Sequence, residues 1–162
     1  MRGKAIPKRK IKPDVKYNRA DIAKLINYIM KGGKKTTAEK IVYGAFDILK
    51  EKTKKDPLVT YEMALRNVGP SLEIRGRRIG GANYQIPFPV NDARRQTLAF
   101  RWIISAARSK KGKTMKEALA QEMLDATKGE GTAFKKKEDT HRMADANKAF
   151  AHFARFTKRK KK

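Results

Sequence analysis

The amino-acid sequence predicts a mainly α protein, a bundle of about six helices with one protruding two-stranded antiparallel β-hairpin. Apolar residues recur with helical spacing through most of the 162 residues. One stretch, SLEIRGRRIGGANYQIPFPV at 71–90, instead alternates apolar and polar residues around a double glycine. The length fits one domain. We expect a basic amino-terminal arm at 1–18, a helical domain at 19–156 with the hairpin at 72–90, and a lysine-rich tail at 157–162.

The first three helices are indicated by their ends. An apolar stripe with i, i+3, i+4, i+7 spacing begins after Asp21 and stops before Gly32 and Gly33, as at a helix C-terminus. Residues 36–39, TTAE, have the form of a capping box, so we expect the second helix to begin there. Asp56 followed by Pro57 predicts the start of the third helix.

Three more helices are expected after the hairpin. Asn91 or Asp92 can cap a helix that runs to about Lys110. Residues 114–117, TMKE, form a second capping box, and that helix should stop at Gly129. The last helix should begin at about Glu138, and its apolar stripe consists of Met143, Ala146, Phe150 and Phe153.

The register of the hairpin can be predicted because a slip of one residue turns every side chain of a strand to the other face. A loop of Gly80 and Gly81 alone would place apolar residues of the first strand on one face with Asn83 and Gln85. A three-residue loop, 79–81, gives one apolar face at the base. We therefore predict this longer loop, which pairs Leu72 with Phe88 and Ile74 with Ile86.

In that register the other face of the ribbon is polar and basic. It carries Glu73, Arg75 and Arg77 opposite Pro87, Gln85 and Asn83. An isolated two-stranded ribbon is marginally stable in water, so its base should pack on helices while its basic tip projects. Such a tip suits a nucleic-acid groove, and an ordinary surface hairpin with solvated arginines is the alternative.

The charge composition predicts a polyanionic partner. The chain has 41 Lys and Arg against 16 Asp and Glu, a net charge of +25, and this self-repulsion is relieved by an anion. No apolar stretch approaches the roughly 20 residues of a membrane span, and no secretory signal is apparent. The absence of cysteine excludes disulfides and thiolate metal sites.

Three arginines recur every seven residues on the expected helix at 91–110. Arg94, Arg101 and Arg108 therefore share one face. Arginine can grip phosphate bidentately without reading the base sequence. We interpret the row as phosphate contacts and not as a solvated face, because few acids are available to pair with it.

No catalytic or metal centre is indicated, and we expect no cofactor. Gly112, Lys113 and Thr114 lack the earlier glycine of a phosphate-binding loop, and a helix precedes them. His141 and His152 are too far apart along one helix to share a metal ion, so each is interpreted as a surface or RNA-facing residue.

The aromatic residues are expected mostly in the core. Phe46, Trp102, Phe150 and Phe153 fall on inward stripes, which favours packing over base stacking. Tyr84 differs because it lies toward the tip of the hairpin. It could stack on a nucleotide or pack at the edge of the core, and the sequence leaves both open.

Four segments resemble, in order and spacing, ribosomal protein S-seven of the bacterial small subunit. They are GGKKTTAEKIVYGA (32–45), RRIGGANYQIP (77–87), RWIISAAR (101–108) and KKKEDTHRMADANKAFAHF (135–153). The resemblance covers roughly residues 10–156, and the ends of the chain depart from the family pattern.

This resemblance implies a structural protein and not an enzyme. Members of the family bind small-subunit ribosomal RNA first and nucleate assembly of the subunit head. They lie near the decoding centre, with the hairpin at the exit site where it contacts transfer RNA. The implied partners are this RNA, exit-site transfer RNA, and the neighbouring proteins S-nine and S-eleven, in the cytoplasm, with no membrane and no homo-oligomer. A general architectural protein that coats nucleic acid through charge is the alternative.

Composition and resemblance together give a set of expected site residues. The expected ribosomal RNA contacts are Arg2, Lys4, Lys8, Arg9, Lys10, Lys34, Lys35, Arg75, Arg77, Arg78, Arg94, Arg95, Arg101, Arg108, Lys110, Lys111, Lys135, Lys136, Lys137 and Arg142. The expected exit-site contacts at the hairpin tip are Gly80, Gly81, Asn83, Tyr84 and Gln85.

Overall fold

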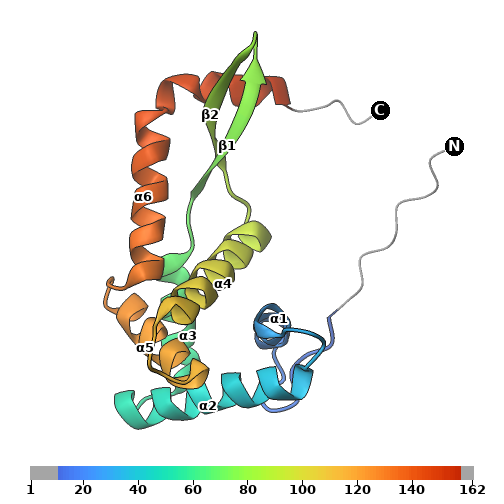
Figure 1. The fold of residues 1–162 in the computed structure, drawn as a ribbon, viewed down its shortest axis with the longest axis vertical. Helices are drawn as coiled ribbons and strands as arrows, with labels where there is room; N and C mark the ends of the chain where they lie inside the picture. The colour runs from blue at the N-terminus through green and yellow to red at the C-terminus, as the bar shows by residue number, and fades with distance from the viewer. Residues whose placement is uncertain (1–10, 158–162) are drawn as a thin grey trace, which may run out of the picture.

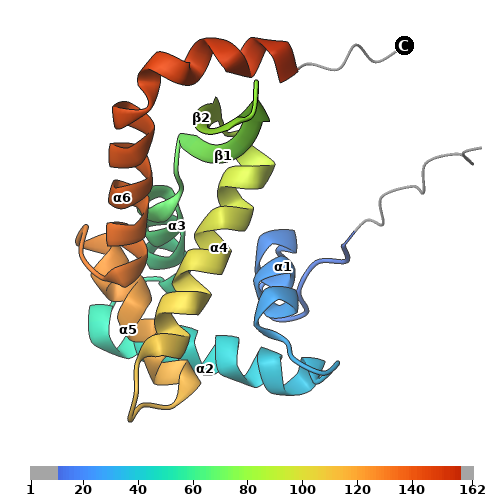
Figure 2. The same cartoon turned by 45° about the horizontal axis from the view of Figure 1, so that its top comes forward.

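The computed structural model describes residues 11–157, and these are mainly helical with a single β-hairpin, as predicted (Figure 1). The elements, in chain order, are α1 (Ala20–Ile29), α2 (Lys35–Thr53), α3 (Pro57–Val68), β1 (Leu72–Ile79), β2 (Ala82–Pro89), α4 (Asp92–Ser109), α5 (Met115–Thr127), α6 (Thr132–Ala146) and the 3-10 helix η1 (Lys148–Thr157). The hairpin rises from one end of the bundle, and α6 and η1 lie beside it (Figures 1 and 2).

The core lies around α5, which packs against α2, α3, α4 and α6. Alanines on α5 let these helices approach closely, and larger apolar side chains from the neighbours fill the remaining space. The largest fully buried side chains include Phe46, Tyr61, Phe100, Leu119 and Met123. The bundle is thus a fixed support for the surfaces around α4.

Three of the predicted helix starts are confirmed, each by a local hydrogen bond. The side chain of Asp56 accepts from the Leu58 amide at 3.0 Å, and that of Asn91 accepts from the Arg94 amide at 3.0 Å. At the third start, the amide of Thr114 donates to Glu117 Oε2 at 3.0 Å within a complete capping box. These signals are local in sequence, which is why the sequence alone reveals them.

The capping box expected at residues 36–39 is wrong. Helix α2 begins at Lys35, so these residues already lie inside the helix, and no side-chain cap is present at Lys34. Glu39 instead lies 3.9 Å from the ammonium of Lys35. Gly32 and Gly33 both have positive φ. The turn that they form leads directly into the first turn of α2.

The predicted start of the last helix at Glu138 is also wrong, because α6 begins at Thr132. Its cap comes from another helix: Glu122 Oε1 on α5 accepts a hydrogen bond of 2.8 Å from the amide of Ala133. Gly131 precedes the helix with φ of 94°, and an added Cβ there would lie 3.0 Å from Glu122 Oε1. A start that depends on a distant carboxylate cannot be found from local spacing.

The single last helix that we expected is two elements. At Asn147 the α-helix ends, and the Asn147 side chain donates to the carbonyl of Met143 at 2.8 Å. The chain then turns into η1, which crosses beside the hairpin (Figure 2). Met143 is therefore 48% exposed and not part of an inward stripe, whereas Phe150 and Phe153 pack against Tyr84.

The predicted register of the hairpin is wrong by one residue. The observed pairs include Glu73 with Phe88 and Arg75 with Ile86, so the loop is Gly80 and Gly81 alone. These glycines have φ of 56° and 92°. Positive φ at both loop positions is typical of the type I′ turn, whose twist matches that of the strands.

The prediction failed because it assumed that only one face of the ribbon is covered. Helix α6 packs on β1, and η1 packs on β2. Ile86 is completely buried, whereas its partner Arg75 is exposed. The Arg75 guanidinium lies 5.3 Å from the centre of the Phe88 ring. Flanking helices therefore remove the need for one apolar face.

Polar contacts of Asp14 and His141 hold the segment before α1 and the base of the hairpin against the helices. Asp14, only 6% exposed, accepts hydrogen bonds from the Tyr43 hydroxyl at 2.6 Å and from the amides of Lys16 and Tyr17 at 3.1 Å. Burial and the bond to Asp14 raise the pKa of Tyr43 to about 12. His141 Nε2 lies 3.2 Å from the Ser71 amide, which joins α6 to the base of the hairpin.

Candidate nucleic-acid interface

The arginine row of α4 begins at the base of the hairpin, where Arg94 is bound to an acid. Its Nε lies 3.1 Å from Glu73 Oε2 on β1. The hydrogen bonds from Arg94 hold the pKa of Glu73 below its usual value. Arg75 donates to the same carboxylate at 3.2 Å. The expectation that the row would meet few acids therefore does not hold at its first member.

The other two members of the row contact α1. The Arg101 guanidinium lies 5.9 Å from the centre of the Tyr28 ring, and Arg108 donates to the carbonyl of Ile29 at 3.2 Å. Both arginines are exposed. A guanidinium carries five N–H donors, so these single contacts orient the side chains and leave donors available for phosphate.

A concave surface joins these two arginines to the turn between α1 and α2. A hollow of about 180 Å³ is lined by residues that include Tyr28, Arg101 and Arg108. A second hollow of about 260 Å³ shares Arg108 and adds Lys31 and Lys34 above an apolar floor. The fold thus brings together Lys34, Arg101 and Arg108, which are distant in sequence.

A second concave surface lies on the other side of α4, against α6. This groove of about 320 Å³ is lined by Trp102, Ser105, Ala106, Ser109, Thr132, Lys135, Lys136 and Asp139. Lys135 and Lys136 are exposed. Ser105 lines both this groove and the hollow beside Tyr28. The exposed ridge of α4, formed by Arg101, Ser105 and Arg108, therefore has a concave basic surface on each side.

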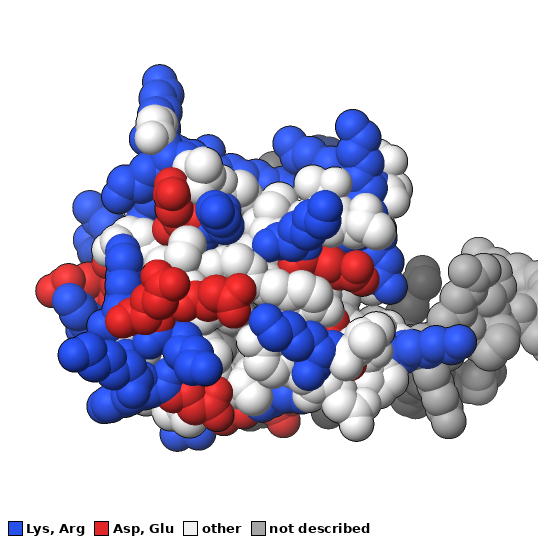
Figure 3. Space-filling model, turned by 90° about the horizontal axis from the view of Figure 1, so that it is seen from below, with Lys and Arg blue, Asp and Glu red and all other residues white. Residues whose placement is uncertain are grey.

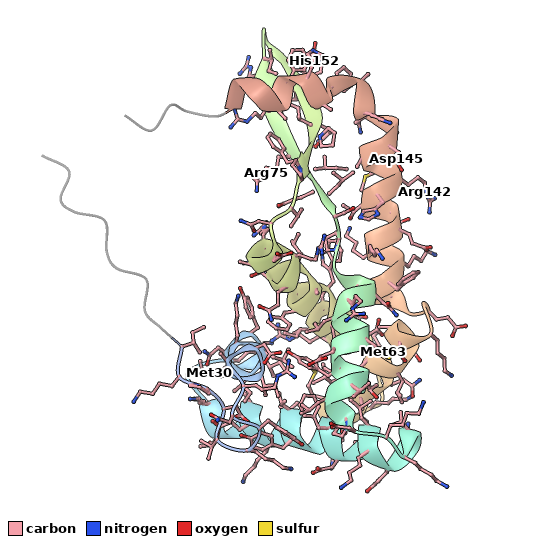
Figure 4. The ribbon with its side chains drawn as sticks, turned by 180° about the vertical axis from the view of Figure 1, so that it is seen from behind. Met30, Met63, Arg75, Arg142, Asp145 and His152 are labelled. Atoms are coloured by element: carbon pink, nitrogen blue, oxygen red, sulfur yellow. The ribbon has the colours of Figure 1, made fainter. Side chains whose placement is uncertain are left out.

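The arginines of the hairpin divide into two kinds. Arg75 is held by Glu73 and by the Phe88 ring. Arg77 and Arg78 are exposed, and as successive residues of a strand they point to opposite faces of the ribbon. Figure 4 shows Arg75 beside the ribbon, where the strands leave the bundle.

The tip residues also divide into two kinds. Gly80, Gly81, Asn83 and Gln85 are exposed. Tyr84 is half-buried, with its ring centre 5.1 Å from that of Phe150 and 5.6 Å from that of Phe153. Of the two possibilities open at Tyr84, the structure shows packing against η1.

Several cations in the predicted set bind within the protein. Lys110 lies 2.8 Å from Glu122 Oε2 and 3.0 Å from Asp125 Oδ2. Burial lowers the pKa of Lys110, but hydrogen bonds to the two carboxylates outweigh it, so its pKa is raised. Lys137 donates to the carbonyl of Asn67 at 2.7 Å.

Two further arginines of the set have weaker internal contacts. Arg95 donates to the carbonyl of Pro70 at 3.2 Å, and Arg142 lies 3.1 Å from Asp139. Arg142 projects from the outer side of α6, near Asp145 (Figure 4). The exposed Lys34, Lys35 and Lys111 complete the described part of the set. Arg2, Lys4, Lys8, Arg9 and Lys10 lie outside the described residues.

The surface charge is not confined to one face. On the face shown in Figure 3, acidic side chains lie between the lysines and arginines. Among residues 11–157, no cluster of three or more metal-binding side chains occurs and no helix is long and apolar enough to span a membrane. Net charge alone therefore does not identify a binding surface on this face.

Comparison with known proteins identifies the family of this chain. Residues 1–148 match the family described as ribosomal protein S7p/S5e. The chain belongs to this family. A protein of Thermotoga maritima named small ribosomal subunit protein uS7 is 59% identical over 94% of this chain and 99% of its own length. Proteins of the same name from Pelotomaculum thermopropionicum and Magnetococcus marinus are 58% and 52% identical, over 92% and 94% of this chain and 96% and 97% of their own lengths.

The structure of this S7p/S5e family member adds two residues to the candidate site that were not predicted from its sequence. Lys31 joins Lys34 in the hollow beside Arg108, and Tyr28 supports Arg101. Lys31 could have been found from its position immediately before the double glycine, because Lys34 and Lys35 follow it in the same turn. The half-buried state of Trp102 had no such signal, since its stripe on α4 is otherwise buried.

Proposed function

We propose that this chain is a structural component of the small ribosomal subunit in the cytoplasm and binds its ribosomal RNA. The observation that carries the proposal is the match to small-subunit proteins over nearly the whole of both chains. Because the match covers nearly the whole of both chains, the relationship extends to the entire fold and is not limited to one shared basic segment. A structural role, and not a catalytic one, follows from this relationship.

The exposed ridge of α4 supplies the RNA contacts in this proposal. Arg101 and Arg108 bind phosphates there, with Lys34 and Lys31 in the adjoining hollow and Lys135 and Lys136 across the ridge. Phosphate contacts of this kind set the position of the protein on the RNA, whereas base contacts give specificity. Arg94 and Lys110 are assigned to holding this surface in place.

The finer part of the proposal concerns location. As a primary binder of ribosomal RNA, the protein nucleates assembly of the subunit head near the decoding centre. Its hairpin lies at the exit site, where Arg77, Arg78 and the exposed tip contact transfer RNA, and proteins S-nine and S-eleven are its neighbours. The exposed tip on a ribbon braced by α6 and η1 supports this assignment.

A competition experiment tests the function. The protein is bound to a fragment of small-subunit ribosomal RNA in about 0.2 M salt, where purely electrostatic binding is weakened. Unlabelled random RNA of equal length then competes in a gel-shift assay. We expect the random RNA to compete much less well than the ribosomal fragment. Equal competition would instead favour the general architectural protein.

A further inference from the structure

The groove between α4 and α6 contains the chain's single tryptophan next to two exposed lysines. Trp102 is half-buried: part of it packs against the core, and it also lines the groove. Aromatic side chains that stay partly open beside cations are typical of single-stranded nucleic-acid sites, because every base has a face that can stack. We expected Trp102 to pack in the core, but part of its side chain is accessible from the groove.

The lysines of this groove differ from their neighbour in sequence. Lys137 is held by the carbonyl of Asn67 and lies 5.1 Å from the centre of the Phe134 ring. Lys135 and Lys136 have no side-chain hydrogen bond or ion pair among the described residues, and both are exposed. Their ammonium groups are therefore available to phosphates at the rim of the groove.

The shape and the one acid of the groove restrict its occupant. A volume of about 320 Å³ is at the lower limit of small-molecule sites, so a single base fits and a duplex does not. Asp139 lines the same groove and is paired with Arg142. A carboxylate repels a phosphate but accepts hydrogen bonds from the amino group of a base.

We propose that the α4–α6 groove holds one unpaired RNA base, stacked on Trp102, with its flanking phosphates on Lys135 and Lys136. The proposal rests on the proposed function, because it specifies how the same RNA is bound. Ser105 connects this groove to the hollow beside Arg101 and Arg108. A strand whose phosphates follow those arginines therefore reaches Trp102 by crossing the ridge of α4. Single-stranded loops and bulges supply such unstacked bases.

The emission of the only tryptophan tests the proposal directly in the wild-type protein. The ribosomal RNA fragment is added while emission and quenching by acrylamide are recorded, and binding is followed in parallel by gel shift. A stacked base is expected to quench the emission and to protect Trp102 from acrylamide. If the fragment binds in preference to random RNA but Trp102 remains as accessible as before, the groove is empty and this proposal is wrong while the proposed function stands.

Two variants measure the contribution of stacking. Trp102→Leu keeps an apolar side chain but removes the stacking surface, and it should weaken binding by about 5-fold to 150-fold, the range for one stacked base. Trp102→Phe keeps a ring and should lose less. Thermal unfolding establishes that both variants are folded. Wild-type affinity in a folded Trp102→Leu protein would overturn the proposal, and loss of preference over random RNA in the wild type would count against the proposed function instead.

Discussion

Arg94 and Lys110, near the two ends of α4, hold the protein together, whereas Arg101 and Arg108 of the same helix face the surroundings. Arg94 binds Glu73 of the hairpin, and Lys110, just past the last residue, binds Glu122 and Asp125 of α5. Between them, Arg101 and Arg108 are exposed beside two concave surfaces. Cations of the same type therefore serve different purposes according to the acids that the fold places near them.

The largest effect is expected at the C-terminal end. Replacing Lys110 with Met leaves Glu122, whose side chain is 0% exposed, without its cation. Removing one partner of a buried ion pair typically costs about 3 to 5 kcal/mol. Because Lys110 remains 22% exposed, we expect a loss of about 3 kcal/mol in the free energy of unfolding, measured with urea at pH 7.

The neighbouring residue gives a matched control. Lys111 is exposed, and Lys111→Met should change the free energy of unfolding by less than about 0.5 kcal/mol. The double variant Lys110→Met with Glu122→Gln should recover much of the loss, because Gln keeps an acceptor for the Ala133 amide without the charge. Equal stability of the two lysine variants would show that Lys110 is not a structural cation.

A smaller effect is expected at the N-terminal end of α4. Arg94→Ala removes the main partner of Glu73 but leaves Arg75 in contact with it. The loss should be about 1.5 kcal/mol at pH 7, near the lower limit for hydrogen bonds to charged groups. Arg78→Ala, on the exposed part of the hairpin, should lose almost nothing.

The pH dependence gives the Arg94 prediction an independent check. Because Arg94 lowers the pKa of Glu73 in the folded state, the stabilisation is present above the pKa of the unfolded chain. It is lost as the pH falls through the lower folded pKa. The difference in unfolding free energy between wild type and Arg94→Ala should therefore shrink below about pH 4.5, the ordinary pKa of Glu. A difference that stays constant down to pH 3 would mean that the carboxylate is not the source of the effect.

Arg101 and Arg108 should show the opposite behaviour. Arg101→Ala with Arg108→Ala should cost no more than about 1 kcal/mol of stability, because each side chain has one weak internal contact. Each phosphate contact removed lowers the slope of log affinity against log salt by about 0.9 on duplex DNA and by about 0.7 on single strands. We expect the slope for the ribosomal fragment to fall by up to about 1.8. An unchanged slope with unchanged affinity would make this part of α4 a solvated face.

The distance in sequence between contacting residues explains which features of the fold could be predicted. The caps at Asp56, Asn91 and Thr114 were predictable because each involves residues close in sequence. The start of α6 depends on Glu122 from α5, and the role of Lys110 depends on the same carboxylate. Neither feature can therefore be predicted from local sequence patterns.

The prediction of the hairpin register failed for a related reason. The register was predicted from a single apolar face, but α6 and η1 cover the ribbon from different sides. The break at Asn147 that creates η1 contains neither proline nor glycine. Arg77 and Lys136 were predicted as RNA contacts from the composition and the resemblance, and the structure shows that both are exposed. Trp102 could not be identified until the fold placed it beside α6.

The smallest effect on stability is expected at the tip of the hairpin, which tests the separation between a braced base and an exposed end. Arg77 pairs with Tyr84, so residues 78–83 can be replaced by Asn-Gly, a sequence that favours the type I′ turn. Tyr84 keeps its contacts with Phe150 and Phe153, and thermal unfolding should change little because exposed turns contribute little to a core. Ribosomal RNA binding through α4 should persist as well. Ribosomes that carry the shortened protein should instead show altered retention of deacylated transfer RNA or altered frame maintenance. If the shortened protein unfolds at a much lower temperature while such ribosomes behave normally, the tip is a brace for the fold and has no contact at the exit site.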